Sequence, residues 1–188
     1  MERKCLNLGC GAFKKPGFVN VDIDPKVHPN ALVDLSKFPY PFGDEEFDHI
    51  ESDHNIEHLD DAFGVMREIH RILKQNGTVV LRMPHFSRGF THPDHRRGFD
   101  VSFPYYFQKS FPGGFSGIEF EHVSSRLVWN AQPYLKKEVL SPGLHYGLLA
   151  IGKVIDILAN LSPAFCSRVW CFWVGGFEEI EFRFRKRA

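Results

Sequence analysis

The feature that most constrains the fold is a series of short apolar segments, each followed by a turn-forming or acidic residue. They lie at residues 5–8, 18–23, 31–34, 47–52 and 78–83. One strongly periodic segment separates the last two. Short apolar strands combined with a helix are typical of an α/β fold with a parallel sheet. Because 188 residues fit one domain, we expect residues 1–188 to form a single α/β domain.

The periodic segment predicts an amphipathic helix. Its apolar residues follow one another at spacings of three or four and form one stripe: Leu59, Phe63, Met66, Ile69 and Leu73. Asp60 or Asp61 is the expected N-cap of this helix. Asn76 and Gly77 are expected to end it in the left-handed conformation.

The second half of the chain begins with a loop-rich segment, residues 84–117. It is rich in aromatic side chains: Phe86, Phe90, Phe99, Phe103, Tyr105, Tyr106, Phe107, Phe111 and Phe115. Two interpretations stand beside each other. The segment is an insertion that covers the substrate as a lid, or it is a hydrophobic cluster beneath a long loop.

Three further elements are expected after this segment. Residues 118–129 form a strand, and Leu148, Ile151, Ile155 and Leu158 mark an amphipathic helix. The apolar stretch 143–161 carries His145, Lys153 and Asp156, so we expect a buried helix and no transmembrane segment. Residues 177–185 alternate strictly, which predicts an antiparallel edge strand.

Charge and cysteine content limit the classes of function. Basic and acidic residues both number 23, so no net charge attracts a polyanion and there is no strong nucleic-acid signal. The four cysteines (Cys5, Cys10, Cys166 and Cys171) lack the paired spacing of a zinc site or a disulfide framework. The N-terminus enters a strand without a signal-peptide core. We therefore expect a cytoplasmic protein with reduced thiols.

The first two predicted strands end in residues that suit an adenosine ligand. Gly9 and Gly11 follow the first strand, where the absence of a Cβ lets a ligand approach the backbone. Asp22 ends the second strand, where a carboxylate can accept hydrogen bonds from both hydroxyls of a ribose. A dinucleotide site would need a third glycine where Lys14 stands and an acid about 20 residues further on. Asp22 follows Gly9 by only 13 residues, which argues against a dinucleotide.

Several segments in this order resemble the class I S-adenosylmethionine-dependent methyltransferases, in particular the small type-11-like group. The similar segments are Leu-Asn-Leu-Gly-Cys-Gly at residues 6–11, Val-Asp-Ile-Asp within 19–25, then 34–42, 47–59 and 67–84. The resemblance implies a Rossmann-like sheet of seven strands, mostly parallel with an antiparallel last strand. It also implies S-adenosyl-L-methionine as cofactor and methyl transfer as the reaction.

The same resemblance implies which residues hold the cofactor. The glycine loop passes under the methionine part, Asp22 binds the ribose, and Ile23 lies against the adenine. The implied set consists of Leu8, Gly9, Cys10, Gly11, Asp22, Ile23, Asp34, Leu35, Ser52, Asp53 and His54. The chain departs from the family at Asn7, which replaces the usual acid, and near Phe13, where a loop glycine is missing.

The histidines supply candidates for a general base. His54 follows the fourth strand and His85 the fifth, and Glu57 stands near His54. An oxygen or nitrogen acceptor needs a base within hydrogen-bond reach, and histidine titrates near neutral pH. We therefore predict His54, Glu57 or His85 as the catalytic base, with a structural role at the helix entry as the alternative for His54.

Three other functions remain open. The chain is a non-catalytic cofactor-binding scaffold or sensor, a metal-dependent hydrolase that uses the Thr-His-Pro-Asp-His segment, or an enzyme of the membrane surface. The last possibility rests on Trp170, Phe172 and Trp173 beside the amphipathic helix. Because Pro93 interrupts any helical face, a hydrogen-bonded turn is the favoured role of His92 and Asp94, and we predict no metal site. The methyl acceptor and the oligomeric state are left open.

Overall fold

The computed structural model describes residues 3–88 and 92–187. Two compact units make up the chain. Unit 1 comprises residues 3–82, 102–124 and 182–187, and unit 2 comprises residues 83–88, 92–101 and 125–181. The segment 84–117, predicted as one insertion, is therefore divided between the two units.

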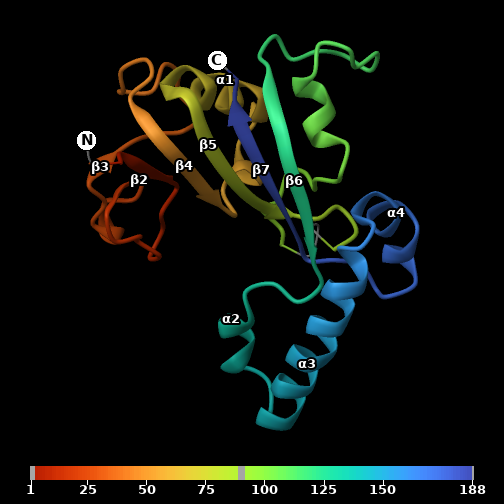
Figure 1. The fold of residues 1–188 in the computed structure, drawn as a ribbon. Helices are drawn as coiled ribbons and strands as arrows, with labels where there is room; N and C mark the ends of the chain where they lie inside the picture. Colours follow the sequence, from red (N-terminus) through yellow and green to blue (C-terminus); the bar gives the residue numbers. More distant parts are fainter. Residues whose placement is uncertain (1–2, 89–91, 188) are drawn as a thin grey trace. The chain divides into compact units, whose positions relative to one another are not determined.

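The sheet contains the seven strands that the resemblance predicted. They are β1 (Cys5–Leu8), β2 (Phe18–Asp22), β3 (Ala31–Leu32), β4 (Phe47–Asp53), β5 (Leu73–Pro84), β6 (Phe120–Val128) and β7 (Glu179–Lys186). Their order is β3-β2-β1-β4-β5-β7-β6. In Figure 1 the blue strand β7 lies between β5 and the teal strand β6. The first five strands pair in parallel, with Leu8 opposite both Val21 and Ser52. The antiparallel part consists of β7 with its neighbours.

The two faces of the sheet differ in polarity. Side chains alternate across a strand, so Leu6, Leu8 and Ile50 lie on one face and are completely buried. The alternate positions Asn7 and Glu51 are polar. Parallel sheets are usually apolar on both faces. Here the connection between β1 and β2 is too short for a covering helix, and hydrogen-bonded polar side chains occupy the second face instead.

Helix α1 (Ala62–Ile72) forms where the apolar periodicity predicted it, but it ends earlier. The carboxylate of Asp61 accepts a hydrogen bond from the backbone N–H of Gly64 and caps the helix. The predicted stop at Asn76 and Gly77 is wrong, because Leu73 already has extended backbone and pairs with Phe47. Asn76 does have a left-handed φ of 60°, inside a bulge of β5 in which residues 74–77 lie opposite Asp48 alone. The burial of Leu73 in the sheet therefore overrides the local helix signal.

The last strand is antiparallel, as predicted, but its predicted place at the edge is wrong. Strand β7 lies between β5 and β6, and β6 forms the edge. The alternation of apolar and polar residues in β7 reflects the difference in polarity between the two faces of the sheet and does not indicate an edge strand. Ile180, Phe182 and Phe184 are buried on the apolar side of this strand.

Part of the aromatic segment belongs to the core of unit 1. The short 3-10 helix η4 (Phe103–Phe107) buries Phe103 and Phe107. The Phe107 ring lies 5.8 Å from that of Phe120 and 5.6 Å from that of Phe184, measured between centroids. Phe103 and Phe107 of the aromatic segment therefore belong to a hydrophobic cluster in unit 1. Phe90 lies outside the described residues, and the lid stays a prediction.

The remaining α-helices of the described residues belong to unit 2. They are α2 (Pro133–Lys137), α3 (Pro142–Ala159) and α4 (Pro163–Arg168). The predicted amphipathic helix exists as α3, but the prediction that it is buried is wrong, because only His145, Gly152 and Ala159 are buried along it. By length and composition alone α3 would be able to cross a membrane.

Candidate functional site

The site begins where β1 and β2 end. Gly9 follows β1 with a left-handed φ of 67°, which glycine adopts without steric cost. The backbone N–H of Gly11 donates to Asp22 Oδ2 over 2.8 Å, and that of Asp24 donates to Oδ1 over 3.0 Å. These two hydrogen bonds orient the Asp22 carboxylate beside the glycine turn. Both oxygens keep lone pairs for further donors.

A cavity of about 250 Å³ opens at these strand ends. It is lined by Gly9, Asp22, Ile23, Val33, Asp34, Leu35, Ser36, Asn55 and Leu59. Five of these residues belong to the set predicted from the resemblance. Ile23 exposes 64% of its surface, so an apolar side chain in the lining is accessible to a ligand. The Ser36 hydroxyl donates to Asp34 Oδ1 over 2.6 Å and lowers the pKa of Asp34.

Asn55 is a member of this site that the sequence reasoning missed. Its side chain lines the cavity, and its buried Nδ2 has no hydrogen-bond partner among the described residues. A buried amide N–H without an acceptor is costly, and it is a ready donor for a polar ligand. A Cβ on Gly9 would lie 2.4 Å from Asn55 Cγ, so the glycine makes room for this side chain. The sequence feature that pointed to Asn55 is its position directly after the predicted site residue His54.

The other predicted cofactor residues support the glycine turn without lining the cavity. Leu8 and Cys10 are buried. Ser52 is buried too, and its hydroxyl donates to the carbonyl oxygen of Leu8 over 3.1 Å. Gly11 contributes its backbone N–H to Asp22. These residues hold the ends of β1 and β4 together beside the cavity.

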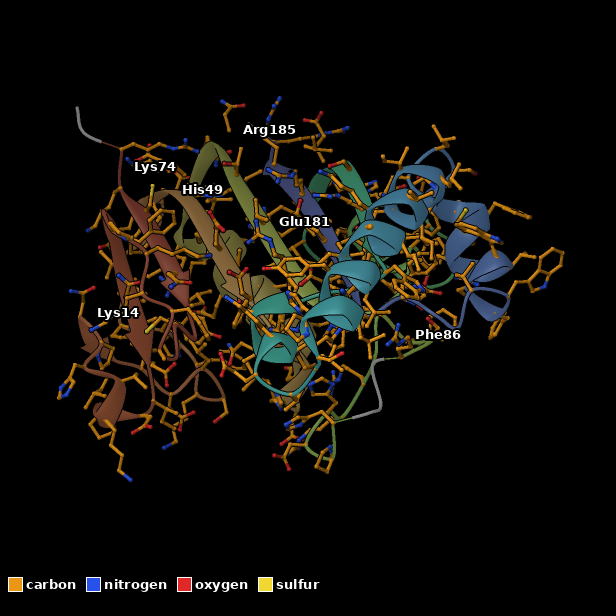
Figure 2. The ribbon with its side chains drawn as sticks, turned by 90° about the horizontal axis from the view of Figure 1, so that it is seen from below. Lys14, His49, Lys74, Phe86, Glu181 and Arg185 are labelled. Carbon is orange, nitrogen blue, oxygen red and sulfur yellow. The ribbon has the colours of Figure 1, made fainter. Side chains whose placement is uncertain are left out.

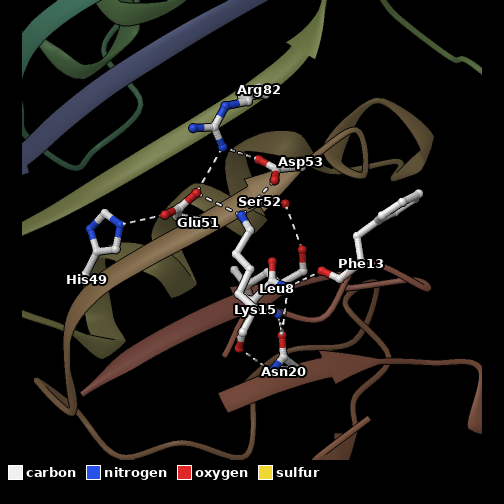
Figure 3. Close-up of polar contacts among 10 residues, drawn as sticks. Leu8, Phe13, Lys15, Asn20, His49, Glu51, Ser52, Asp53 and Arg82 are labelled. Atoms are coloured by element: carbon white, nitrogen blue, oxygen red, sulfur yellow. Dashed lines mark hydrogen bonds and ion pairs between the residues drawn. The ribbon is translucent and has the colours of Figure 1, made fainter. Parts of the chain in front are cut away.

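Asp53 takes part in a network of charged side chains instead of facing the cavity (Figure 3). Lys15 Nζ lies 2.7 Å from Asp53 and 2.8 Å from Glu51, and Arg82 contacts the same two carboxylates at 2.7 and 2.9 Å. The His49 ring lies 3.1 Å from Glu51. The hydrogen bond from His49 and the two cations hold the pKa of the Glu51 carboxyl well below its usual range. The network fastens the loop after β1 to β4 and β5.

Asn7, at the position where the family usually has an acid, stabilises the same loop. Its Nδ2 donates to Asn20 Oδ1 over 2.9 Å and to the carbonyl oxygen of Phe13 over 3.3 Å (Figure 3). Asn20 also accepts from the backbone N–H of Lys15. The neutral amides of Asn7 and Asn20 therefore stabilise the loop after β1, and neither of them lines the cavity.

His54 and Glu57, two of the three predicted bases, lie together in unit 1. His54 has a left-handed φ of 49°, and its Nδ1 lies 3.5 Å from Glu57 Oε1. Glu57 is completely buried in the 3-10 helix η2 (Ile56–His58). A buried carboxylate beside one ring nitrogen can orient an imidazole whose other nitrogen takes up a proton.

His85, the third predicted base, lies in unit 2 and is completely buried. Its Nε2 lies 2.8 Å from Ser167 Oγ and its Nδ1 2.7 Å from Ser87 Oγ. The ring of Phe86, labelled in Figure 2, is tilted against that of His85 with the centroids 4.7 Å apart, and its centroid lies 6.2 Å from that of Phe172. Burial lowers the pKa of His85 to about 4. Because both nitrogens are engaged in a closed environment, His85 has the surroundings of a structural residue.

Residues 92–95 of the Thr-His-Pro-Asp-His segment form a local turn in unit 2, and Thr91 lies outside the described residues. The rings of His92 and His95 stack with centroids 4.9 Å apart. The backbone N–H of Asp94 donates to His92 Nδ1 over 3.2 Å. These contacts agree with the hydrogen-bonded turn that the sequence favoured.

Comparison with known proteins agrees with this geometry. Residues 6–81 match the model of a family described as a methyltransferase domain. This segment contains every residue that lines the cavity. No curated protein sequence matches the chain.

Solved structures resemble the whole chain. A SAM-dependent methyltransferase from Archaeoglobus fulgidus is 16% identical with a TM-score of 0.61, and the match covers 98% of this chain and 86% of that one. The YcgJ protein from Bacillus subtilis is 17% identical with a TM-score of 0.55, over 100% and 93% of the two chains. Phosphoethanolamine N-methyltransferase 2 from Haemonchus contortus, solved with S-adenosyl-L-methionine, is 16% identical with a TM-score of 0.57, over 100% and 49%.

At these identities the structural likeness establishes the fold, and the family match places the methyltransferase domain on the strands that form the cavity. The chain therefore has the fold of these solved structures, and its residues 6–81 resemble a methyltransferase domain.

Proposed function

We propose that this protein binds S-adenosyl-L-methionine in the cavity beside Gly9 and Asp22 and transfers its methyl group to an acceptor. The observation that carries the proposal is the lining of that cavity. A glycine turn, an oriented carboxylate and a buried amide donor line one space of about 250 Å³ with apolar side chains. These groups match the ribose, the amino-acid part and the adenine of the cofactor.

Each group has a defined task in this proposal. Asp22 accepts hydrogen bonds from the ribose hydroxyls, and Asn55 donates to the carboxylate of the methionine part. Ile23 and Leu35 supply apolar contacts for the adenine. The chemistry that the cofactor supplies when bound is an electrophilic methyl group on a sulfonium. Alignment of an acceptor with that group provides much of the rate acceleration, so little further machinery is required.

Replacing Asp22 by asparagine is expected to weaken binding of S-adenosyl-L-methionine about 10- to 100-fold. Asparagine keeps an acceptor for Gly11 but loses the charge-assisted hydrogen bonds to the ribose, each worth about 1.5–3 kcal/mol. Isothermal titration calorimetry with S-adenosyl-L-methionine measures the difference. Asp24→Asn is the matched control, because Asp24 caps the 3-10 helix η1 (Pro25–Val27) and does not line the cavity. Equal affinity of both variants would show that Asp22 does not bind the cofactor.

We further propose His54 as the base that accepts the proton of the acceptor, with Glu57 as its positioning residue. His54→Asn is expected to lower the rate of methyl transfer about 100-fold while the affinity for S-adenosyl-L-methionine stays within twofold. Asparagine tolerates the left-handed backbone, so the change removes the imidazole without adding strain. His28→Asn is the control, because His28 has the same left-handed backbone with a φ of 50° and is exposed.

The transfer assay uses S-adenosyl-L-methionine labelled in its methyl group, incubated with metabolite, lipid, RNA and protein fractions of a cell extract. Label in one fraction identifies the class of acceptor and permits single-turnover comparison of the two histidine variants. Equal rates of wild type and His54→Asn would rule out His54 as the base. Tight binding without label in any fraction would favour the non-catalytic scaffold or sensor.

A further inference from the structure

The strongest unexplained feature of the molecule is an apolar surface on unit 2. Six large apolar side chains of α3 are exposed: Leu144, Tyr146, Ile151, Val154, Ile157 and Leu158. Four more follow in and beside α4: Leu161, Phe165, Phe172 and Trp173. We call these ten residues the α3 surface. Trp173 exposes 81% of its surface and Leu161 79%, far more than single apolar residues on an ordinary surface require.

A stripe on the opposite side fastens α3 to the rest of unit 2. Asp156 Oδ1 accepts from the backbone N–H of Trp129 over 2.7 Å. Asn160 accepts from the backbone N–H of Leu127 and donates to its carbonyl oxygen, both over 2.8 Å. A Cβ on Gly152 would lie 3.2 Å from Asn130, so the helix packs closely there. Residues 152, 156 and 160 are four apart and lie on one side of the helix.

This attachment decides how α3 meets its surroundings. A helix that crosses a bilayer is surrounded by lipid, which offers no partner for polar groups. In α3, Asp156 and the following Asn160 bind the backbone at the end of β6, so this side of the helix is held against the protein. The helix therefore presents one side to the protein and the other, apolar side outward. This arrangement is compatible with a helix that lies in the plane of a membrane interface.

The charges around the α3 surface favour an anionic lipid layer over a second copy of the chain. Residues 133–174 contain four basic side chains, of which Lys136 pairs with Glu178 and Arg168 with Asp100, so Lys137 and Lys153 supply the positive charge beside the exposed Glu138. Lys153 is the only exposed charged residue on α3. Lysine is depleted at the centre of protein interfaces, but at a membrane its stem lies along apolar surface while the ammonium reaches the headgroups. Exposed Tyr146 and Trp173 suit the same boundary.

We propose that the α3 surface docks this protein on an anionic lipid bilayer as a peripheral membrane protein. The apolar side chains enter the boundary between headgroups and acyl chains, and Lys137 and Lys153 contact lipid phosphates. The unit that carries the cavity contributes no residue to this surface. Membrane docking is therefore separable from cofactor binding.

Flotation of the full chain with vesicles tests the proposal. Wild type is expected to float with phosphatidylcholine vesicles that contain phosphatidylglycerol, and much less with phosphatidylcholine alone. Ile157→Glu is expected to lower the partition coefficient at least about tenfold, since it places a charge on the apolar side. Lys153→Gln is expected to lower it about fivefold on anionic vesicles only. Val123→Glu, at an exposed apolar position on β6, is the matched control and is expected to float like wild type.

Four outcomes would overturn the proposal. The first is wild type that does not float with either vesicle. The second is flotation that Ile157→Glu leaves intact although thermal unfolding shows that the variant is folded. The third is a concentration-dependent dimer in analytical ultracentrifugation that Ile157→Glu dissociates, without flotation, which would assign the α3 surface to a second copy. The fourth is retention in cell membranes at alkaline pH, which would indicate a helix that spans the bilayer.

Discussion

Replacing Gly9 by alanine is expected to weaken binding of S-adenosyl-L-methionine about 100-fold, which corresponds to about 2.7 kcal/mol. Two effects combine. The residue has a left-handed φ of 67°, and its new Cβ would lie 2.4 Å from Asn55 Cγ. The backbone strain costs about 1–2 kcal/mol, and the clash displaces the amide that we assign to the cofactor carboxylate. Isothermal titration calorimetry and urea denaturation measure the two consequences separately.

The variant Gly17→Ala distinguishes the effect of backbone strain from the effect of displacing the Asn55 amide. Gly17 has a φ of 77°, but a Cβ there would have no heavy atom within 4 Å. This control is expected to lose stability by a similar amount while it binds S-adenosyl-L-methionine like wild type. If Gly9→Ala binds as tightly as Gly17→Ala, the contact between Gly9 and Asn55 is not part of the cofactor site.

The free energy of unfolding is expected to fall by about 2.5 kcal/mol between pH 7 and pH 4.5 because of His85 alone. Burial lowers the pKa of His85 to about 4, whereas a histidine in the unfolded chain titrates near 6.5. Between these values the unfolded chain binds a proton that the folded chain does not bind. The contribution of His85 to stability is therefore complete above pH 6.5 and is lost as the pH falls toward 4.

Urea denaturation of wild type and His85→Gln at both pH values isolates this contribution, because other titrating groups are common to both proteins. The variant is expected to start from a lower stability, since it disturbs the hydrogen bonds to Ser87 and Ser167, but to lose less on acidification. His28→Gln, at an exposed histidine, is expected to follow wild type. If His85→Gln and wild type lose equal stability between the two pH values, then His85 is protonated in the folded chain.

The sequence by itself determined the parallel half of the sheet and the position of α1. Strand β1 was predicted with its observed ends, and α1 was predicted from a stripe of apolar residues. These features depend on local periodicity and on the residues that end a strand. A window of about ten residues contains all of this information. The same information placed Gly9 and Asp22 at neighbouring strand ends.

Tertiary structure alone decided the features that depend on partners distant in the sequence. Leu73 joins β5 because it pairs with Phe47, and β7 lies inside the sheet because β6 pairs on its far side. Asn55 enters the cavity because Gly9 leaves it space. In α3 the same apolar composition suits a buried helix or a docking surface. The hydrogen bonds of Asp156 and Asn160 and the close packing at Gly152 show which side faces the protein, because a local pattern records polarity and not the neighbour that will cover it.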